Sequence, residues 1–182
     1  GWPMRKHGLS CDNLVACEVV TAEGKLVRAS ADEHADLFWS LQGGGGNFGI
    51  VTRFEYRLHP VGPEVLAGVV LYPAEQAGEV LRSYRDCVAG APEELTTIVI
   101  LTKAPPAPFL PEHLHGRPVV ILAVCYAGDL AEGKAVLAPL RTLAEPLIDL
   151  IEPKPYVEHQ GMLDAGVPHG LRYYWKSHYL PA

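Results

Sequence analysis

A run of four glycines followed by Asn-Phe-Gly, at residues 43–49, is the feature that most limits how this chain can fold. Consecutive glycines allow positive φ angles and let main-chain amides approach a bound group closely, which suits a phosphate or the polar edge of a ring system. On composition alone, such a run is more typical of a flexible connector. Phe48 inside the run, and the patterned segments on both sides of it, instead favour a turn that holds one shape.

Two familiar glycine motifs do not describe this run. A dinucleotide-binding loop leads from a strand into a helix, whereas the pattern here leads from a helix into a strand. A phosphate-binding P-loop ends in Gly-Lys-Ser/Thr, and no lysine follows Gly49 here. The run therefore indicates a main-chain cradle of another kind.

The segments around the glycines have clear local patterns. Residues 14–22 and 25–29 are rich in β-branched residues and predict a hairpin around Glu23-Gly24. Residues 30–33 have the Ser-x-x-Glu form of a capping box, which predicts the start of a helix through residues 36–41. The glycine run ends that helix, and residues 49–58 predict the next strand.

The breaker cluster His-Pro-Val-Gly-Pro at residues 59–63 is the best domain boundary, and we expect domains at residues 1–61 and 62–182. The fold class expected for the second domain is α+β, with helices on one face of a mostly antiparallel sheet. Its expected strands are residues 65–72, 95–102, 119–126, 147–151 and an aromatic one at 172–179, and its expected helices are residues 73–88 and 130–143.

Charge and hydropathy exclude two classes of partner. The net charge is −6 and no basic patch is present, so we expect no nucleic-acid partner. No apolar run approaches the roughly 20 residues that cross a bilayer, so we expect no membrane span.

The cysteines and histidines are scattered. Cys11, Cys17, Cys87 and Cys125 show no CxxC pairing, and no HxH or HExxH occurs, so we expect free thiols and no metal site. Free thiols favour a reducing, cytoplasmic compartment. Both ends of the chain look cut, because Gly1 begins inside a motif and an aromatic run precedes the last residues.

The stretch GWPMRKHGLSCDNLVACEVVTAEGKLVRAS, followed by DLFWSLQGGGGNFGIVTRFEYRLHP, closely resembles the FAD-linked oxidases of the berberine-bridge-enzyme-like family. That family belongs to the vanillyl-alcohol-oxidase superfamily with its PCMH-type FAD-binding domain. Its pattern is G-x-x-x-R-x-x-G-L-x-x-D-N, a hairpin, then D-L-F-W-A-L-R-G-G-G-G-N-F-G-V-V-T. Ser40 and Gln42 replace the more usual alanine and arginine. Residues 156–160 and 173–177 resemble the family's substrate domain.

The resemblance implies that residues 1–61 are the C-terminal part of an FAD-binding domain and residues 62–182 part of a substrate-binding domain. Family members pass a hydride from an organic substrate to the flavin, which oxygen commonly reoxidises. Ile50 and Val51 are expected to supply an apolar wall or backbone hydrogen bonds. The full set of residues expected nearest the FAD is Gly1, Asp12, Asn13, Gly45, Asn47, Gly49, Ile50 and Val51.

The resemblance assigns no catalytic residue, because the family's flavin-linking histidine and its catalytic base fall outside this sequence. Tyr174 and Lys176 can face the flavin or serve ordinary sheet packing, and packing is favoured. His159 and Gln160 are expected at a helix surface. Because much of the FAD domain is not in this sequence, we expect the chain alone to bind FAD weakly or not at all, and to be inactive.

Two other functions stay open on the sequence. One is a non-catalytic α+β binding module, and the other is a flavin dehydrogenase that passes electrons to an acceptor other than oxygen. The substrate is expected to be a small organic molecule, with sugars, alkaloids and polyketides all open. Covalent attachment of the flavin and the oligomeric state are not fixed by these residues.

Overall fold

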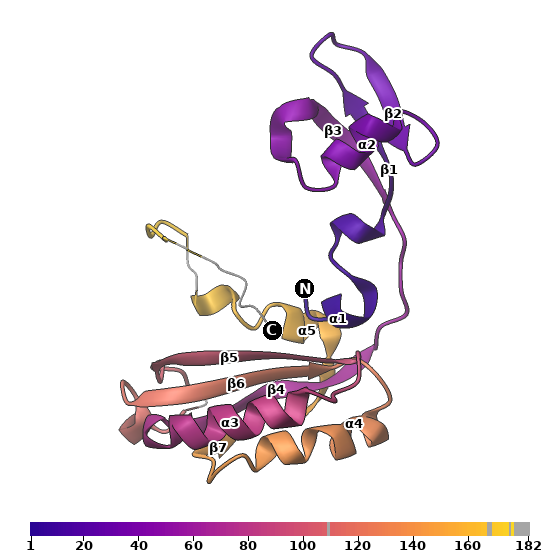
Figure 1. Ribbon diagram of the computed structural model, residues 1–182. Coiled ribbons are helices and arrows are strands. Elements are labelled where there is room, and N and C mark those ends of the chain that lie inside the picture. Colours follow the sequence, from indigo (N-terminus) through magenta and orange to yellow (C-terminus); the bar gives the residue numbers. More distant parts are fainter. Residues whose placement is uncertain (109, 167–168, 175, 177–182) are drawn as a thin grey trace.

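The computed structural model describes residues 1–108, 110–166, 169–174 and 176. It contains two antiparallel sheets, a three-stranded one in the N-terminal part and a larger one beyond it. Residues 57–63 connect the two sheets. Residues 1–13, which precede the first strand, contact the larger sheet (Figure 1). The N-terminal segment is therefore shared between both halves.

The first sheet has the strand order β2-β1-β3. β1 (Leu14–Val20) and β2 (Leu26–Ser30) form the expected hairpin, and β3 (Ile50–Tyr56) pairs antiparallel with the other edge of β1. Helix α2 (Ala35–Leu41) covers one face and buries Phe38 against apolar side chains of β1. The hairpin, helix and strand predictions are confirmed here to within two residues.

The capping-box prediction is wrong about where the helix begins. The Ser30 hydroxyl accepts the amides of Asp32 and Glu33, at 3.3 and 3.2 Å, as a cap would. However, the Ser30 amide also donates to the Glu33 carbonyl at 2.7 Å, which closes a separate turn. The helix starts only at Ala35, after His34 in a left-handed conformation with φ of 50°.

The second sheet has the order β5-β6-β4-β7, with β8 also paired to β4. Its pairings are antiparallel, and helices α3 (Ala77–Val88) and α4 (Leu130–Leu137) both cover the same face (Figure 1). The short helices α1 (Met4–His7) and α5 (Tyr156–Gln160) lie over the opposite face. The α+β fold class is confirmed. The strands are β4 (Glu64–Pro73), β5 (Leu95–Lys103), β6 (Pro118–Tyr126), β7 (Ile148–Asp149) and β8 (Glu152–Pro155).

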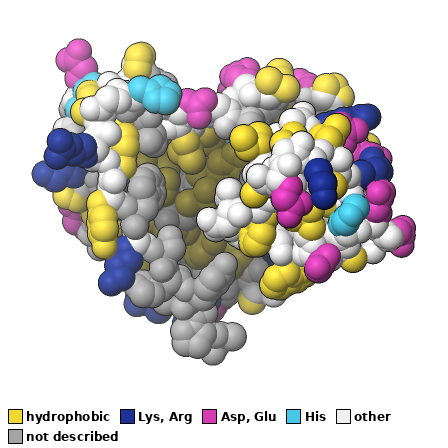
Figure 2. Space-filling view, turned by 90° about the horizontal axis from the view of Figure 1, so that it is seen from above, with side chains coloured by type: hydrophobic (Ala, Val, Ile, Leu, Met, Phe, Trp, Pro, Cys, Tyr) yellow, Lys and Arg dark blue, Asp and Glu magenta, His cyan; other side chains and the backbone are white. Residues whose placement is uncertain are grey.

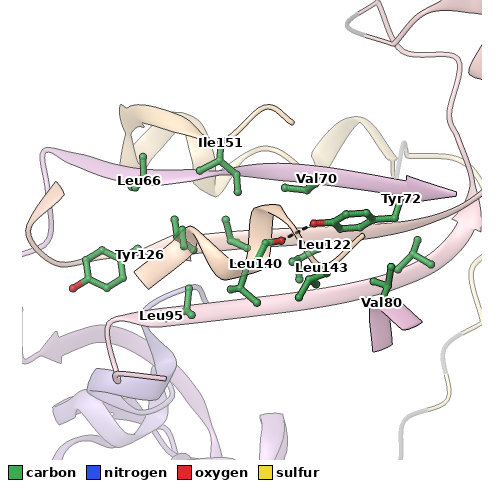
Figure 3. Packing of buried hydrophobic residues seen from close by; sticks show 13 residues of the cluster. Leu66, Val70, Tyr72, Val80, Leu95, Leu122, Tyr126, Leu140, Leu143 and Ile151 are labelled. Carbon is green, nitrogen blue, oxygen red and sulfur yellow. Dashed lines mark hydrogen bonds between the residues drawn. The ribbon is translucent and has the colours of Figure 1, made fainter. Parts of the chain in front are cut away.

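The main core lies between the second sheet and its two helices. Alternate residues of β4, among them Leu66, Val70 and Tyr72, point toward α3 and α4 and are fully buried (Figure 3). The Tyr72 hydroxyl donates to the Leu140 carbonyl at 2.7 Å, so its polar atom is satisfied inside the core. Period-two alternation therefore leaves the next residues of each strand to form the opposite face.

Element ends differ from the predictions where proline intervenes. β4 continues through Pro73 and a short 3₁₀ turn follows, so α3 starts at Ala77 and not at residue 73. α4 ends at Leu137, and a 3₁₀ turn with Pro139 at its start replaces the last part of the predicted helix. Proline has no amide hydrogen and its ring collides with the carbonyl one turn earlier, which stops an α-helix.

The aromatic segment near the C-terminus does not form the expected strand where it is described. Residues 172–174 have no strand pairing, and residues 175 and 177–179 lie outside the described residues. The weak strand expected at 147–151 is reduced to the two residues of β7.

Candidate functional site

The glycine turn (residues 43–49) and the Asp-Asn loop (residues 8–13) lie next to each other. The Gln42 side chain donates from Nε2 to the Cys11 carbonyl oxygen, 3.1 Å away, and so ties the two loops together. Asp12 lines one depression of about 510 Å³ together with Gly43 and Gly44. Two segments about thirty residues apart in the sequence thus form one surface.

The glycine turn holds a conformation that other residues rarely adopt. Gly43, Gly45 and Gly49 have φ angles of 151°, 73° and 134°. A Cβ added at Gly43 or Gly45 would meet nothing within 4 Å, so the main chain there faces open space. A Cβ at Gly49 would lie 2.5 Å from the Val20 carbonyl oxygen, so this glycine is needed for packing on β1.

Asn47 acts within the turn itself. Its Nδ2 donates to the Gly44 carbonyl at 3.2 Å and closes the turn internally. A small side chain that bonds its own backbone fixes the loop's shape. The predicted cofactor residues Gly45 and Asn47 are therefore close in space, with distinct structural roles.

Both polar side chains of the Asp-Asn loop are used to hold the loop. Asp12 Oδ2 accepts the Leu9 amide at 2.7 Å. Asn13 Nδ2 donates to the carbonyls of His7 and Leu9, at 2.6 and 2.9 Å. Since these groups are already paired, the loop offers its main chain, more than its side chains, to a ligand.

Asn13 also lines a second, larger cleft of about 530 Å³, which Gly1 borders as well. His59 Nε2 lies 2.6 Å from Asn13 Oδ1, and the rings of His7 and His59 stack with centroids 4.0 Å apart. Burial and the neighbouring His59 lower the pKa of His7, which favours an uncharged ring. Tyr156 of α5 also lines this cleft.

Ile50 and Val51 do not present their side chains together. Ile50 is 73% exposed, whereas Val51 packs with Phe38 in the core of the first sheet. Consecutive residues of a strand point to opposite faces, so only one of the two side chains can contribute to an apolar wall.

His159 is the residue that the sequence prediction placed wrongly. It was expected at the surface but is only 2% exposed, because α5 packs it against the second sheet and the ring of Trp2. Its Nε2 has no hydrogen-bond partner among the described residues. Burial, together with the charge of Lys154, lowers the pKa of His159 to about 4. No local pattern in residues 156–160 marks this burial.

The face of the second sheet opposite α3 and α4 forms the floor of a hollow. Apolar residues from β4 and β6, such as Val69 and Ile121, gather on this face. Figure 2 looks down on it and shows hydrophobic side chains at the bottom of the hollow.

In the described ranges, no group of three or more His, Cys, Asp or Glu side chains is placed to hold a metal ion. No helix in that part of the chain is long and apolar enough to cross a membrane. All four cysteines are free thiols, with Cys17 and Cys125 buried and Cys87 exposed.

Similar proteins are FAD-linked oxidoreductases and oxidases. An FAD-linked oxidoreductase from Dictyostelium discoideum is 30% identical over 178 residues, covering 97% of this chain and 36% of that protein. The crystal structure of 6-hydroxy-D-nicotine oxidase from Arthrobacter nicotinovorans matches with a TM-score of 0.76 at 28% identity, over 94% of this chain and 36% of that one. The chain is a homologue of FAD-linked oxidoreductases.

Other solved oxidases share the fold. Xylooligosaccharide oxidase from Myceliophthora thermophila, solved with xylobiose, matches with a TM-score of 0.65 at 27% identity, over 87% of this chain and 32% of that one. No family model matches the chain. The chain spans about a third of the length of the curated relatives it matches.

Proposed function

We propose that this chain forms one wall of the flavin site and the floor of the substrate site in an FAD-dependent oxidase. In this assignment residues 1–61 belong to the FAD-binding domain and residues 62–182 to the substrate-binding domain. The oxidase transfers a hydride from a small organic substrate to the flavin, with oxygen as the final acceptor. The observation that carries the proposal is the 3.1 Å hydrogen bond from the Gln42 side chain to the Cys11 carbonyl, which joins the glycine turn and the Asp-Asn loop into one surface.

The residues of this surface fit a flavin. Bare glycine backbone at Gly43 and Gly45 lets a flat or charged group approach the main chain without a Cβ in the way. The internal bonds of Asp12 and Asn13 keep the neighbouring loop rigid. When bound, FAD supplies the hydride acceptor, and the protein supplies position and electrostatics. The chain's share is to hold and orient the cofactor through main-chain groups.

The substrate is proposed to be a small organic molecule. One structural neighbour is an oxidase of 6-hydroxy-D-nicotine and another was solved with xylobiose, so both a heterocycle and a sugar fall within the range of the neighbours. The larger cleft is lined by residues of α1 and α5 as well as by Gly1 and Asn13, and both helices lie over the face of the second sheet that forms the hollow (Figure 1). We therefore propose that the substrate lies between this face of the sheet and the flavin wall.

The test is a titration of the ¹⁵N-labelled chain with FAD, followed by amide NMR. The amides of Gly43, Gly44 and Asp12 are expected to shift. Because the chain spans 36% of a relative, binding is expected to be about micromolar or weaker. Gly45→Ala is expected to weaken binding at least severalfold, because the new Cβ enters the open side of the turn.

Gly24→Ala is the matched control. Gly24 lies in the hairpin turn and, like Gly45, has φ of 73° and no atom within 4 Å of an added Cβ. Both variants therefore carry the same backbone strain, and only one lies at the proposed site. Equal FAD affinity in the two variants, or shifts confined to residues away from both loops, would contradict the proposed flavin wall.

A further inference from the structure

A small apolar cavity lies in the floor of the hollow. It has a volume of about 140 Å³ and is lined by Val69 and Leu71 of β4, Ile100 of β5, and Ile121 and Ala123 of β6, among others. The strand register explains why these residues meet. Val69 pairs with Ala123, Leu71 pairs with Ile121, and Ile121 also pairs with Ile100. All five therefore lie on one face of three adjacent strands, opposite the main core.

The walls of the cavity are held by the protein's own bonds. Leu110 borders the cavity, and its amide donates to the Ala107 carbonyl at 2.9 Å. Leu110 lies between Ala104 and Arg117 in the sequence. The Ala104 amide donates to the Arg117 carbonyl at 2.8 Å and so holds the two ends of this segment together. Met162 and Leu163, which follow α5, form the remaining wall. The cavity is thus formed before any ligand arrives.

Every residue lining the cavity in the described part of the chain is apolar. A hydroxyl buried there would lose its hydrogen bonds to water and find no replacement, which opposes its binding. A sugar ring carries several such hydroxyls. A hydrocarbon ring carries none, and an apolar cavity of about 150 Å³ in another protein holds benzene.

We propose that this cavity binds the apolar ring of the substrate, which makes the substrate an aromatic or alicyclic compound and not an oligosaccharide. The term substrate here rests on the proposed oxidase function. Whole ligand pockets usually occupy about 300–1,000 Å³, so the cavity takes one ring only. The polar and reacting part of the molecule stays in the hollow above the floor.

The test uses benzyl alcohol and xylobiose as probes of the full chain, with methyl-labelled NMR as the readout. Benzyl alcohol is expected to shift the methyl signals of Leu71 and Ile121, and xylobiose is not. Ile100→Phe fills the cavity and is expected to weaken benzyl alcohol binding at least tenfold. Ile98→Phe is the matched control, since Ile98 lies two residues away on the same face of β5, is 38% exposed and does not line the cavity.

A second variant guards against misfolding of the first. Leu163 is 46% exposed, so Leu163→Asn leaves the sheet intact while it makes one wall polar, and it is also expected to weaken benzyl alcohol binding. The proposal is overturned if xylobiose shifts the same methyl groups as strongly. Absence of benzyl alcohol binding, or equal binding by the Ile100 and Ile98 variants, overturns it as well. The assay contains no FAD, so failure of the flavin proposal is seen separately in the FAD titration.

Discussion

The indole ring of Trp2 packs on the imidazole of His159, with centroids 4.4 Å apart and planes inclined by 44°. The contact joins the N-terminal segment to α5, and both side chains are buried. It lies on the face of the second sheet that also bears the hollow. The Nε2 of His159 has no hydrogen-bond partner among the described residues, so the ring packs on Trp2 with this nitrogen unpaired.

His159 is expected to make the fold less stable in mild acid. Burial and the charge of Lys154 lower its pKa to about 4 in the folded state, against roughly 6.5 when unfolded. Between these values the unfolded chain binds a proton that the folded chain does not, so stability falls as pH decreases through this window. Between about pH 7.5 and pH 5 the loss from this group is about 2 kcal/mol, measured as the free energy of urea unfolding.

The control for this prediction is the same His→Gln substitution at an exposed histidine. His159→Gln is expected to lose this part of the pH dependence, whereas His113→Gln, at an exposed histidine, keeps the wild-type dependence. Carboxylates contribute equally to all three proteins and cancel in the difference. Parallel pH curves for the two variants would show that His159 is not the group responsible.

Tyr72→Phe is expected to destabilise the second sheet by about 1–3 kcal/mol, because it leaves the buried Leu140 carbonyl without its donor. The lost bond is short, 2.7 Å, and joins β4 to the turn after α4. Thermal or urea unfolding measures the change. The same substitution at Tyr174, which is 89% exposed, is expected to have almost no effect. A neutral Tyr72 variant would mean that water replaces the hydroxyl.

Gly68→Ala is expected to disrupt the packing of β4 against the segment between β7 and β8. Gly68 has φ of 154°, and an added Cβ would lie 2.1 Å from the Leu150 carbonyl oxygen, which is backbone and cannot swing aside. We expect a loss above about 3 kcal/mol, consistent with the cost of overpacking plus backbone strain. Gly116→Ala is the control, because Gly116 also has positive φ, of 74°, but faces open space. Similar unfolding energies for the two variants would contradict the clash.

Local patterns predicted the elements well where one physical rule dominates. The alternation in β4 and β6 and the breaker at residues 59–63 correspond to real strands and a real connection. The glycine turn was predicted to be rigid from Phe48, whose ring in fact lies where a Cβ on Gly44 would go, only 2.5 Å away. In each case the signal and its cause lie within a few residues.

Long-range relationships were not predictable in the same way. The burial of His159 depends on Trp2, at the other end of the chain, and nothing in residues 156–160 signals it. The helix after Ser30 starts late because a backbone bond to Glu33 competes with the cap. The contact between the glycine turn and the Asp-Asn loop depends on Gln42, whose side chain donates to the Cys11 carbonyl. This glutamine stands where the resemblance leads one to expect arginine, so the contact was not predictable from the motif.

Arg5 is expected to fix the N-terminal segment against the second sheet. Its guanidinium donates to the main-chain carbonyls of Leu95 and Ala91, at 2.9 and 3.2 Å. Lysine carries the same charge but cannot present two donors in a fixed fork, so Arg5→Lys is expected to cost about 1–2 kcal/mol. Hydrogen exchange of the α1 amides should rise with it, because the helix then detaches without global unfolding. Arg53→Lys is the control, since Arg53 forms an exposed pair with Glu18 that lysine can also make. If α1 exchanges equally fast in both variants, the two carbonyl bonds do not hold it.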